Sequence, residues 1–147
     1  MKTIYFDMDG TFVNLYGVEN WLNYLTNKDT KPYDIAMPLF NMNSFAKAIH
    51  KLQKNGYKVG VISWCAKNSN SDYDNQVISS KKKWLKKHLK SVDFDEIHIL
   101  KYGTPKYIVA NENDILFDDE INNRENWHGV AYDVDNILNT IRSLVSS

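Results

Sequence analysis

Short apolar segments alternate with longer segments of helical periodicity, and this alternation restricts the fold more than any other feature of the sequence. The segment at 58–63 is apolar almost throughout, which is typical of a central strand buried on both faces. The predicted strands cover 4–6, 58–63, 96–100, 114–119 and 129–132. Helices between strands predict a parallel sheet whose crossovers are right-handed.

The predicted helices cover 43–55, 73–92, 106–110 and 134–145, and Gly56 is placed to end the first of them. We therefore expect an α/β fold, a Rossmann-like three-layer sandwich around a five-stranded parallel sheet of order 3-2-1-4-5. A chain of 147 residues allows one domain, 1–147, and is too short for two ordinary domains.

Charge and hydropathy exclude several classes of partner. Lysine plus arginine equals aspartate plus glutamate at 18 each, so no net charge favours nucleic acid or a membrane. No apolar run approaches the roughly 20 residues of a membrane span, and the early acids do not suit a secretory signal. The single cysteine, Cys65, cannot form an internal disulfide. We expect a cytoplasmic protein with no membrane partner, and no zinc site because the histidines are widely separated.

Polar side chains follow three of the predicted strands. The carboxyl ends of parallel strands meet at one edge of a sheet, where open α/β sheets bind their ligands. Neighbouring carboxylates repel one another unless a cation lies between them, and hard oxygen ligands suit Mg²⁺. The sequence therefore predicts a Mg²⁺ site at this edge. The side chains concerned are Asp7 and Asp9, Ser63, and Asp118 with Asp119.

The segment Asp7-Met8-Asp9-Gly10 allows other interpretations when it is taken alone. Similar sequences occur in solvated turns and in the calcium loops of EF-hands. The EF-hand does not fit, because Phe12 and Val18 occupy the places of its glycine and glutamate. The solvated turn remains an alternative on these residues alone.

Four segments, in order along the chain, resemble the motifs of the haloacid dehalogenase superfamily of phosphotransferases. They are Asp7-Met8-Asp9-Gly10-Thr11, Val59-Gly60-Val61-Ile62-Ser63, Lys106, and Ile115-Leu116-Phe117-Asp118-Asp119. Within the superfamily the chain most resembles the 5'(3')-deoxyribonucleotidases and their phage and bacterial relatives. The features that carry this finer resemblance are the acid pair, the helix from Tyr73 to Leu89, and Thr104-Pro105-Lys106.

The resemblance implies Mg²⁺-dependent hydrolysis of a phosphomonoester. Asp7 would be the nucleophile that forms an aspartyl-phosphate, and Asp9 would act as general acid and then as base. An acid at the second position favours phosphate chemistry over dehalogenation. The implied metal ligands are Asp7, the backbone carbonyl of Asp9, Asp118 and Asp119, and the implied phosphate-binding residues are Ser63, Trp64 and Lys106.

Residues 12–42 form an insertion where the resemblance places a small cap. We expect one helix in it, at 18–25, followed by a segment too apolar for a solvated loop. The insertion is shorter than the cap of the deoxyribonucleotidases, so it does not determine which phosphomonoester is the substrate. Candidates for substrate contact, with core packing as the alternative, are Tyr16, Trp21, Tyr33 and Phe40.

The expected partner is a small phosphorylated substrate, with a nucleoside monophosphate as the leading hypothesis. The alternatives are another phosphomonoester, such as a sugar phosphate or a nucleic-acid 3' phosphate, a nucleic-acid-binding protein, and a regulatory protein that binds Mg²⁺ and phosphate without turnover. Nucleic acid would contact lysines expected on an exposed helix face, at 81–83, 86, 87 and 90. Nucleic acid is possible but not favoured, and Cys65 is not expected to be a nucleophile.

Overall fold

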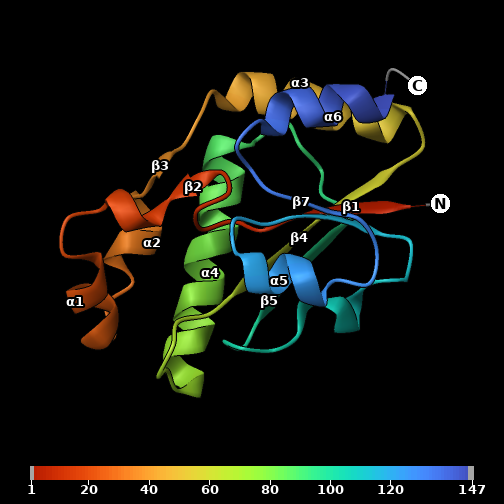
Figure 1. The fold of residues 1–147 in the computed structure, drawn as a ribbon. Coiled ribbons are helices and arrows are strands. Elements are labelled where there is room, and N and C mark those ends of the chain that lie inside the picture. Colours follow the sequence, from red (N-terminus) through yellow and green to blue (C-terminus); the bar gives the residue numbers. More distant parts are fainter. Residues whose placement is uncertain (1, 146–147) are drawn as a thin grey trace.

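The computed structural model describes residues 2–145, and its central feature is a five-stranded parallel sheet (Figure 1). The strands are β1 (Thr3–Phe6), β4 (Lys58–Trp64), β5 (Glu96–Leu100), β6 (Ile115–Phe117) and β7 (Ala131–Tyr132). Their order, β5-β4-β1-β6-β7, confirms the predicted 3-2-1-4-5 arrangement. Because β1 pairs with β4 and with β6, the three strands that end in polar side chains are neighbours.

Helices cover both faces of this sheet, as a three-layer sandwich requires. α3 (Met42–Lys54) and α6 (Ile137–Val145) pack together on one side, and α5 (Ile121–Asn126) lies on the other (Figure 1). α4 (Ser71–His88) connects β4 to β5, and the 3₁₀ helix η2 (Lys106–Val109) precedes β6.

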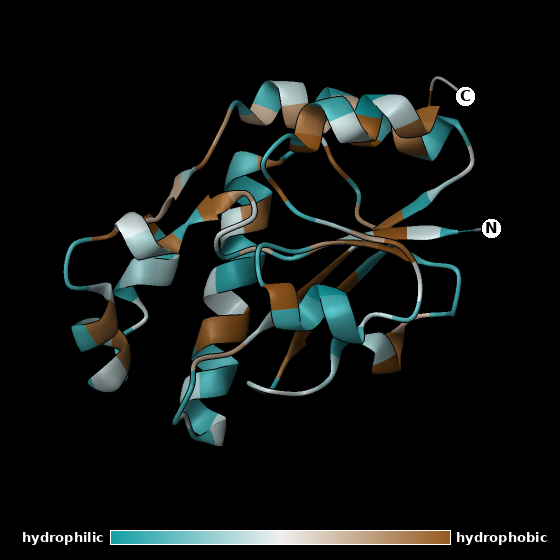
Figure 2. Ribbon diagram, viewed as in Figure 1, coloured by the Kyte–Doolittle hydropathy of each residue, from teal (hydrophilic) through white to brown (hydrophobic). Residues whose placement is uncertain are grey.

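Alternation along β1 divides the apolar core between the two faces. Ile4 and Phe6 join the cluster that contains Phe45 of α3, whereas Tyr5 joins the opposite cluster with Leu116 and Trp127. A strand buried on both faces has no polar side, which explains its unbroken apolar sequence. Figure 2 shows hydrophobic residues along the central strands and hydrophilic residues over much of α4.

The insertion contains more structure than the single predicted helix. Its elements are β2 (Val13–Asn14), the 3₁₀ helix η1 (Leu15–Gly17), α1 (Trp21–Thr26), α2 (Lys31–Ile35) and β3 (Met37–Pro38). β2 and β3 form a small antiparallel sheet. The sequence does not predict α2, because a proline such as Pro32 usually breaks a helix. Proline is tolerated in a first turn, where its missing N–H has no partner to lose, and Pro32 occupies such a position.

α5 was not predicted either. Its sequence, INNREN, has no apolar periodicity, and no residue of this helix is fully buried. α4 also ends at His88, four residues before the predicted end of that helix. Among residues 2–145, no helix combines the length and the apolar character needed to cross a membrane.

Candidate active site

A tight turn after β1 brings the first acid pair to the edge of the sheet. The backbone N–H groups of Thr11, Phe12 and Val13 all donate to the carbonyl of Met8, at 3.0–3.1 Å. Gly10 has a backbone φ of +82°, which residues other than glycine rarely adopt. A Cβ there would also overlap the Asp119 carboxylate. Glycine is therefore required both by the backbone and by the close approach of Asp119.

Three acids from two neighbouring strands converge on one point. Oxygen atoms of Asp7, Asp118 and Asp119 all lie within 4.8 Å of one another. Lys106 lies between two of them, because its Nζ donates to Asp7 Oδ1 at 2.8 Å and to Asp118 Oδ2 at 2.7 Å. Asp7, Asp118 and Lys106 are all buried, so these charges interact with little screening by water.

Side chains outside the predicted set hold this cluster in place. Thr11 Oγ1 donates to Asp7 Oδ2 at 3.0 Å, and Asn123 Nδ2 donates to Asp118 Oδ2 at 3.1 Å. Arg124 donates to the Asp118 carbonyl at 3.0 Å. Asn123 and Arg124 belong to α5, so the helix that the sequence did not predict serves to orient the second acid pair. Thr11 belongs to the first motif, but the sequence alone does not indicate this role.

Crowding of carboxylates perturbs the titration of the second acid pair. Burial and the nearby Asp7 raise the pKa of Asp118 to about 6 and that of Asp119 to about 8. Burial alone would lower the pKa of Lys106, but the Asp7 and Asp118 carboxylates outweigh it and raise that pKa. Lys106 is therefore a permanent cation that compensates only part of the local negative charge.

A second lysine, Lys81 of α4, also enters the site. Its Nζ donates to Asp9 Oδ2 at 2.7 Å, to Ser63 Oγ at 2.6 Å and to the Trp64 carbonyl at 2.8 Å. The expectation that Lys81 lies on an exposed basic face was wrong, because its side chain is only 2% exposed. Lysines 82, 83, 86, 87 and 90 are exposed, as expected.

The sequence held a signal for this burial. Lys81 lies four residues after Val77 and three before Trp84, both of which are buried. Residues at these spacings share one face of a helix, so Lys81 interrupts the apolar stripe of α4. A lysine inside such a stripe needs a buried acidic partner, and here that partner is Asp9.

The charge balance of the site suits a divalent cation. When all four are ionised, the carboxylates of Asp7, Asp9, Asp118 and Asp119 carry two formal negative charges more than the ammonium groups of Lys81 and Lys106 compensate. Asp7, Asp118 and Asp119 could hold the cation, since carboxylate oxygens are preferred ligands of Mg²⁺. The Asp9 carboxylate points to Lys81 instead, so its implied contribution through the backbone carbonyl stays a prediction.

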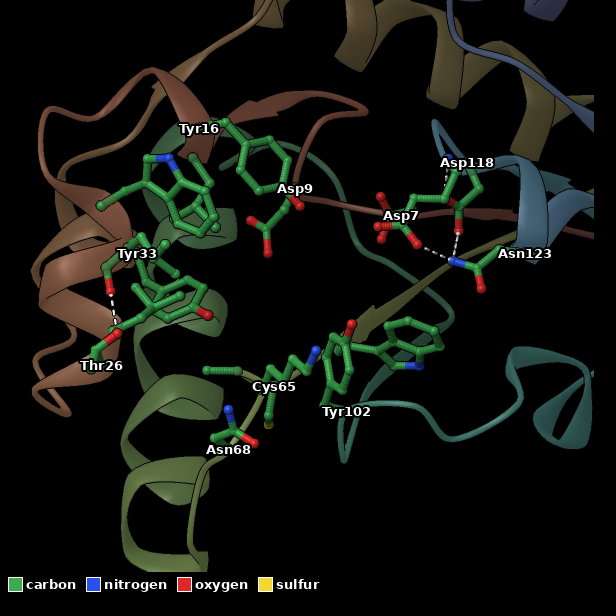
Figure 3. A pocket seen from close by; sticks show the side chains of 18 of the residues that line it. Asp7, Asp9, Tyr16, Thr26, Tyr33, Cys65, Asn68, Tyr102, Asp118 and Asn123 are labelled. Atoms are coloured by element: carbon green, nitrogen blue, oxygen red, sulfur yellow. Dashed lines mark hydrogen bonds between the residues drawn. The ribbon is translucent and has the colours of Figure 1, made fainter.

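A cavity of about 320 Å³ opens between the acids and the insertion (Figure 3). Tyr16, Trp21 and Tyr33 line it from the insertion. Trp64 and Tyr102 line it from the sheet edge, with their ring centroids 5.1 Å apart. Tyr102 was not among the predicted residues. The cavity therefore joins the acid cluster to a largely aromatic wall.

Phe40 does not belong to this wall. It packs against Phe45 at a centroid distance of 5.2 Å and contacts the main core. Its role as a substrate candidate is corrected to core packing, because the chain has already returned from the insertion to α3 at this point.

The remaining predicted residues lie where β4 ends. Ser63 is buried beside Lys81. The Trp64 ring lies 5.2 Å from Lys106 Nζ, and its Nε1 donates to the Thr104 carbonyl at 2.8 Å. Burial raises the pKa of the Cys65 thiol to about 11, so this residue stays protonated and is a poor nucleophile at neutral pH.

Comparison with solved structures identifies the type of fold. D,D-heptose 1,7-bisphosphate phosphatase from Burkholderia thailandensis matches with a TM-score of 0.64 over 100% of both chains, at 12% identity. This likeness shows that the two proteins share a fold. The enzyme of the same name from B. bronchiseptica, complexed with magnesium and phosphate, matches with a TM-score of 0.54 at 14% identity, over 89% of this chain and 78% of that one. No protein-family model and no curated protein matches the sequence.

The close approach of Gly10 to Asp119 predicts a metal-binding defect in Gly10→Ala. Gly56→Ala is the matched control, because Gly56 also has positive φ, at +93°, but a Cβ there meets nothing within 4 Å. Both variants should lose roughly 1–2 kcal/mol of unfolding free energy. Only Gly10→Ala should weaken Mg²⁺ binding, by about tenfold or more, since it displaces a carboxylate of the cluster. Calorimetric Mg²⁺ titration gives the answer, and equal affinities in wild type and Gly10→Ala would contradict this account of the turn.

The raised pKa of Asp119 predicts how stability depends on pH without metal. The folded protein holds this proton more tightly than the unfolded chain does, so the resulting stabilisation is lost as the pH rises toward about 8. In a chelator, Asp119→Asn should therefore gain stability relative to wild type between pH values of about 5 and about 8. Added Mg²⁺ should restore the wild type at the higher pH. Thermal unfolding measures the stability of each variant, and Asp135→Asn, at an exposed position, is the control. If the stability difference between Asp119→Asn and wild type does not change with pH, the raised pKa of Asp119 is refuted.

Proposed function

We propose that this protein is a Mg²⁺-dependent phosphomonoester hydrolase that acts through an aspartyl-phosphate on Asp7. The observation that carries the proposal is the environment of the Asp7 carboxylate. It lies at the centre of the sheet edge, held by Lys106 and Thr11, within a group of three acids that could bind a divalent cation. Asp9, two residues away, lies on the same cavity.

In the first step, an oxygen of Asp7 attacks phosphorus and the bond from phosphorus to the ester oxygen breaks. Asp9 gives its proton to the departing oxygen. In the second step, water attacks the phosphorus of the aspartyl-phosphate and Asp9 takes a proton from that water. The bond from phosphorus to the Asp7 oxygen breaks, which releases inorganic phosphate and regenerates the Asp7 carboxylate. Burial raises the pKa of Asp9, although the nearby Lys81 acts in the opposite direction. The raised pKa favours the protonated form of Asp9 that the first step requires.

Charge on the transferring phosphoryl group is met by positioned donors. Lys106 makes two hydrogen bonds to acids and retains a third N–H for a phosphoryl oxygen. Ser63 is the second donor. A bound Mg²⁺ would supply further positive charge at the same oxygens.

For the substrate, we propose a nucleoside monophosphate on the strength of the aromatic wall. Tyr16 and Trp21 form an edge-on pair at 5.0 Å, and Trp64 and Tyr102 form another at 5.1 Å. Aromatic surfaces of this kind can stack a planar base. The cavity of about 320 Å³ is within the usual range for small-molecule sites.

A sugar phosphate is the second candidate. It is favoured by the structural likeness to two phosphatases named for a heptose bisphosphate. Aromatic side chains also pack against the apolar faces of sugar rings, so the wall alone does not separate the two substrates. A comparison of turnover rates on nucleotides and on sugar phosphates separates them.

The first test is phosphate release from a panel of deoxyribonucleoside and ribonucleoside monophosphates, sugar phosphates and a DNA 3' phosphate, with and without Mg²⁺. We expect Mg²⁺-dependent release that falls by at least about 10³-fold in Asp7→Asn, because the nucleophile is removed. Asp135→Asn, an exposed acid far along the chain, should be unaffected. The substrate hypothesis predicts that nucleotides rank first.

The outcomes separate the hypotheses. Sugar phosphates ranking first would support the second candidate and leave the chemistry intact. Binding of Mg²⁺ and phosphate without release from any substrate would contradict the enzymatic proposal and favour a regulatory protein. Salt-sensitive retention of DNA or RNA without release would favour nucleic-acid binding through the exposed lysines of α4.

A further inference from the structure

Lys81 is a buried cation to which the proposed reaction assigns no task. Its three hydrogen bonds, to Asp9 Oδ2, Ser63 Oγ and the Trp64 carbonyl, use all three hydrogens of an ammonium group. Lys81 therefore has no donor left for a phosphoryl oxygen. Lys106 differs, because it donates only two hydrogen bonds, to Asp7 and Asp118, and keeps one donor free.

The bond to Ser63 fixes the direction of the serine hydroxyl. An ammonium group is a donor only, so Ser63 Oγ must accept this bond, and the hydrogen of the hydroxyl is left to donate elsewhere. The bond to Asp9 has a similar effect. It occupies Oδ2 and leaves Oδ1 as the oxygen that can exchange a proton with substrate or water.

Lys81 also connects three separate parts of the chain. Asp9 follows β1, Ser63 ends β4, and the Tyr33 ring of the insertion lies 5.1 Å from Lys81 Nζ. The ring covers the ammonium with an apolar surface that a cation favours. One ammonium group thus joins the turn after β1, the end of β4 and the insertion.

We propose that Lys81 is a positioning residue that aims both Asp9 and Ser63 at the bound phosphate. The proposal rests on the proposed function. It differs from a purely structural role, in which Lys81 would only neutralise Asp9, because positioning makes a specific demand on the chemistry. If Lys81 holds Asp9 ready to protonate the leaving oxygen, its loss should matter most for substrates that need that proton.

Leaving groups differ in this need. An alkoxide is a strong base and leaves slowly without a proton, whereas a nitrophenolate leaves readily without one. We therefore compare kcat/KM, which reports the step in which the leaving group departs, for two substrates: the alkyl phosphate that the wild type hydrolyses fastest, and p-nitrophenyl phosphate. In Lys81→Met, kcat/KM for the alkyl phosphate should fall about tenfold more than kcat/KM for the aryl phosphate, a fraction of the usual contribution of a general acid.

Two further variants make the comparison specific. Lys82→Met removes an exposed lysine from the neighbouring position of α4 and should leave both rates unchanged. Asp9→Asn should show the same selectivity for the leaving group as Lys81→Met. In the double variant, removal of Lys81 should add no further selectivity, since the group that it positions is already gone.

The proposal is overturned if Lys81→Met slows both substrates equally, or if its selectivity persists in the Asp9→Asn background. Lys81→Gln, a neutral side chain that still donates hydrogen bonds, provides the same comparison if Lys81→Met does not fold. A wild type that hydrolyses neither substrate would refute the proposed function itself, and this inference with it. An active wild type with an unselective Lys81→Met refutes the inference alone.

Discussion

Excess negative charge at the carboxyl edge of the sheet is the constraint on which this structure depends. Four carboxylates gather there, and only two buried ammonium groups compensate them. Burying a carboxylate without a partner costs several kcal/mol, so the fold tolerates the arrangement only because Lys106 contacts both Asp7 and Asp118 and Lys81 contacts Asp9. The two charges that remain suit one Mg²⁺. The same imbalance that opposes folding thus prepares the site for a cation.

α4 joins this edge to the insertion. Its Tyr73 hydroxyl donates to the Asp29 carbonyl at 2.7 Å, and its Trp84 Nε1 donates to the Ala36 carbonyl at 2.8 Å. Lys81, between these two anchors, reaches the acids. The insertion is therefore held by the same helix that supplies a cation to the site.

The sequence was sufficient to predict that the acids gather at one edge, because the carboxyl ends of parallel strands meet there. The strand order was also predicted correctly, although strand periodicity alone does not determine it. Lys106 could be named only through its place in a motif series. Lys81 was missed because a run of charged residues suggested a solvated face, although its register with Val77 and Trp84 indicated burial. α5 and α2 escaped prediction for local reasons. α5 has no apolar stripe, and α2 has a proline, Pro32, in its first turn.

The aromatic residues show the limit of composition as evidence. Tyr16, Trp21, Tyr33 and Phe40 are all apolar rings within one insertion, and nothing in their spacing separates the three that line the cavity from the one that packs on Phe45. The separation arises from tertiary structure, since β3 returns the chain toward α3 before Phe40 is reached.

The central claim is that Asp7 carries the phosphoryl group, and mass spectrometry of an acid-quenched reaction tests it most directly. Wild-type protein, Mg²⁺ and an active substrate are mixed and quenched within one turnover, and the peptides are then analysed. The account predicts one added phosphoryl group on the peptide that contains Asp7, and none on the same peptide from Asp7→Asn. Steady release of phosphate with no phosphorylated Asp7 peptide at any quench time would contradict it, because water would then attack the substrate directly.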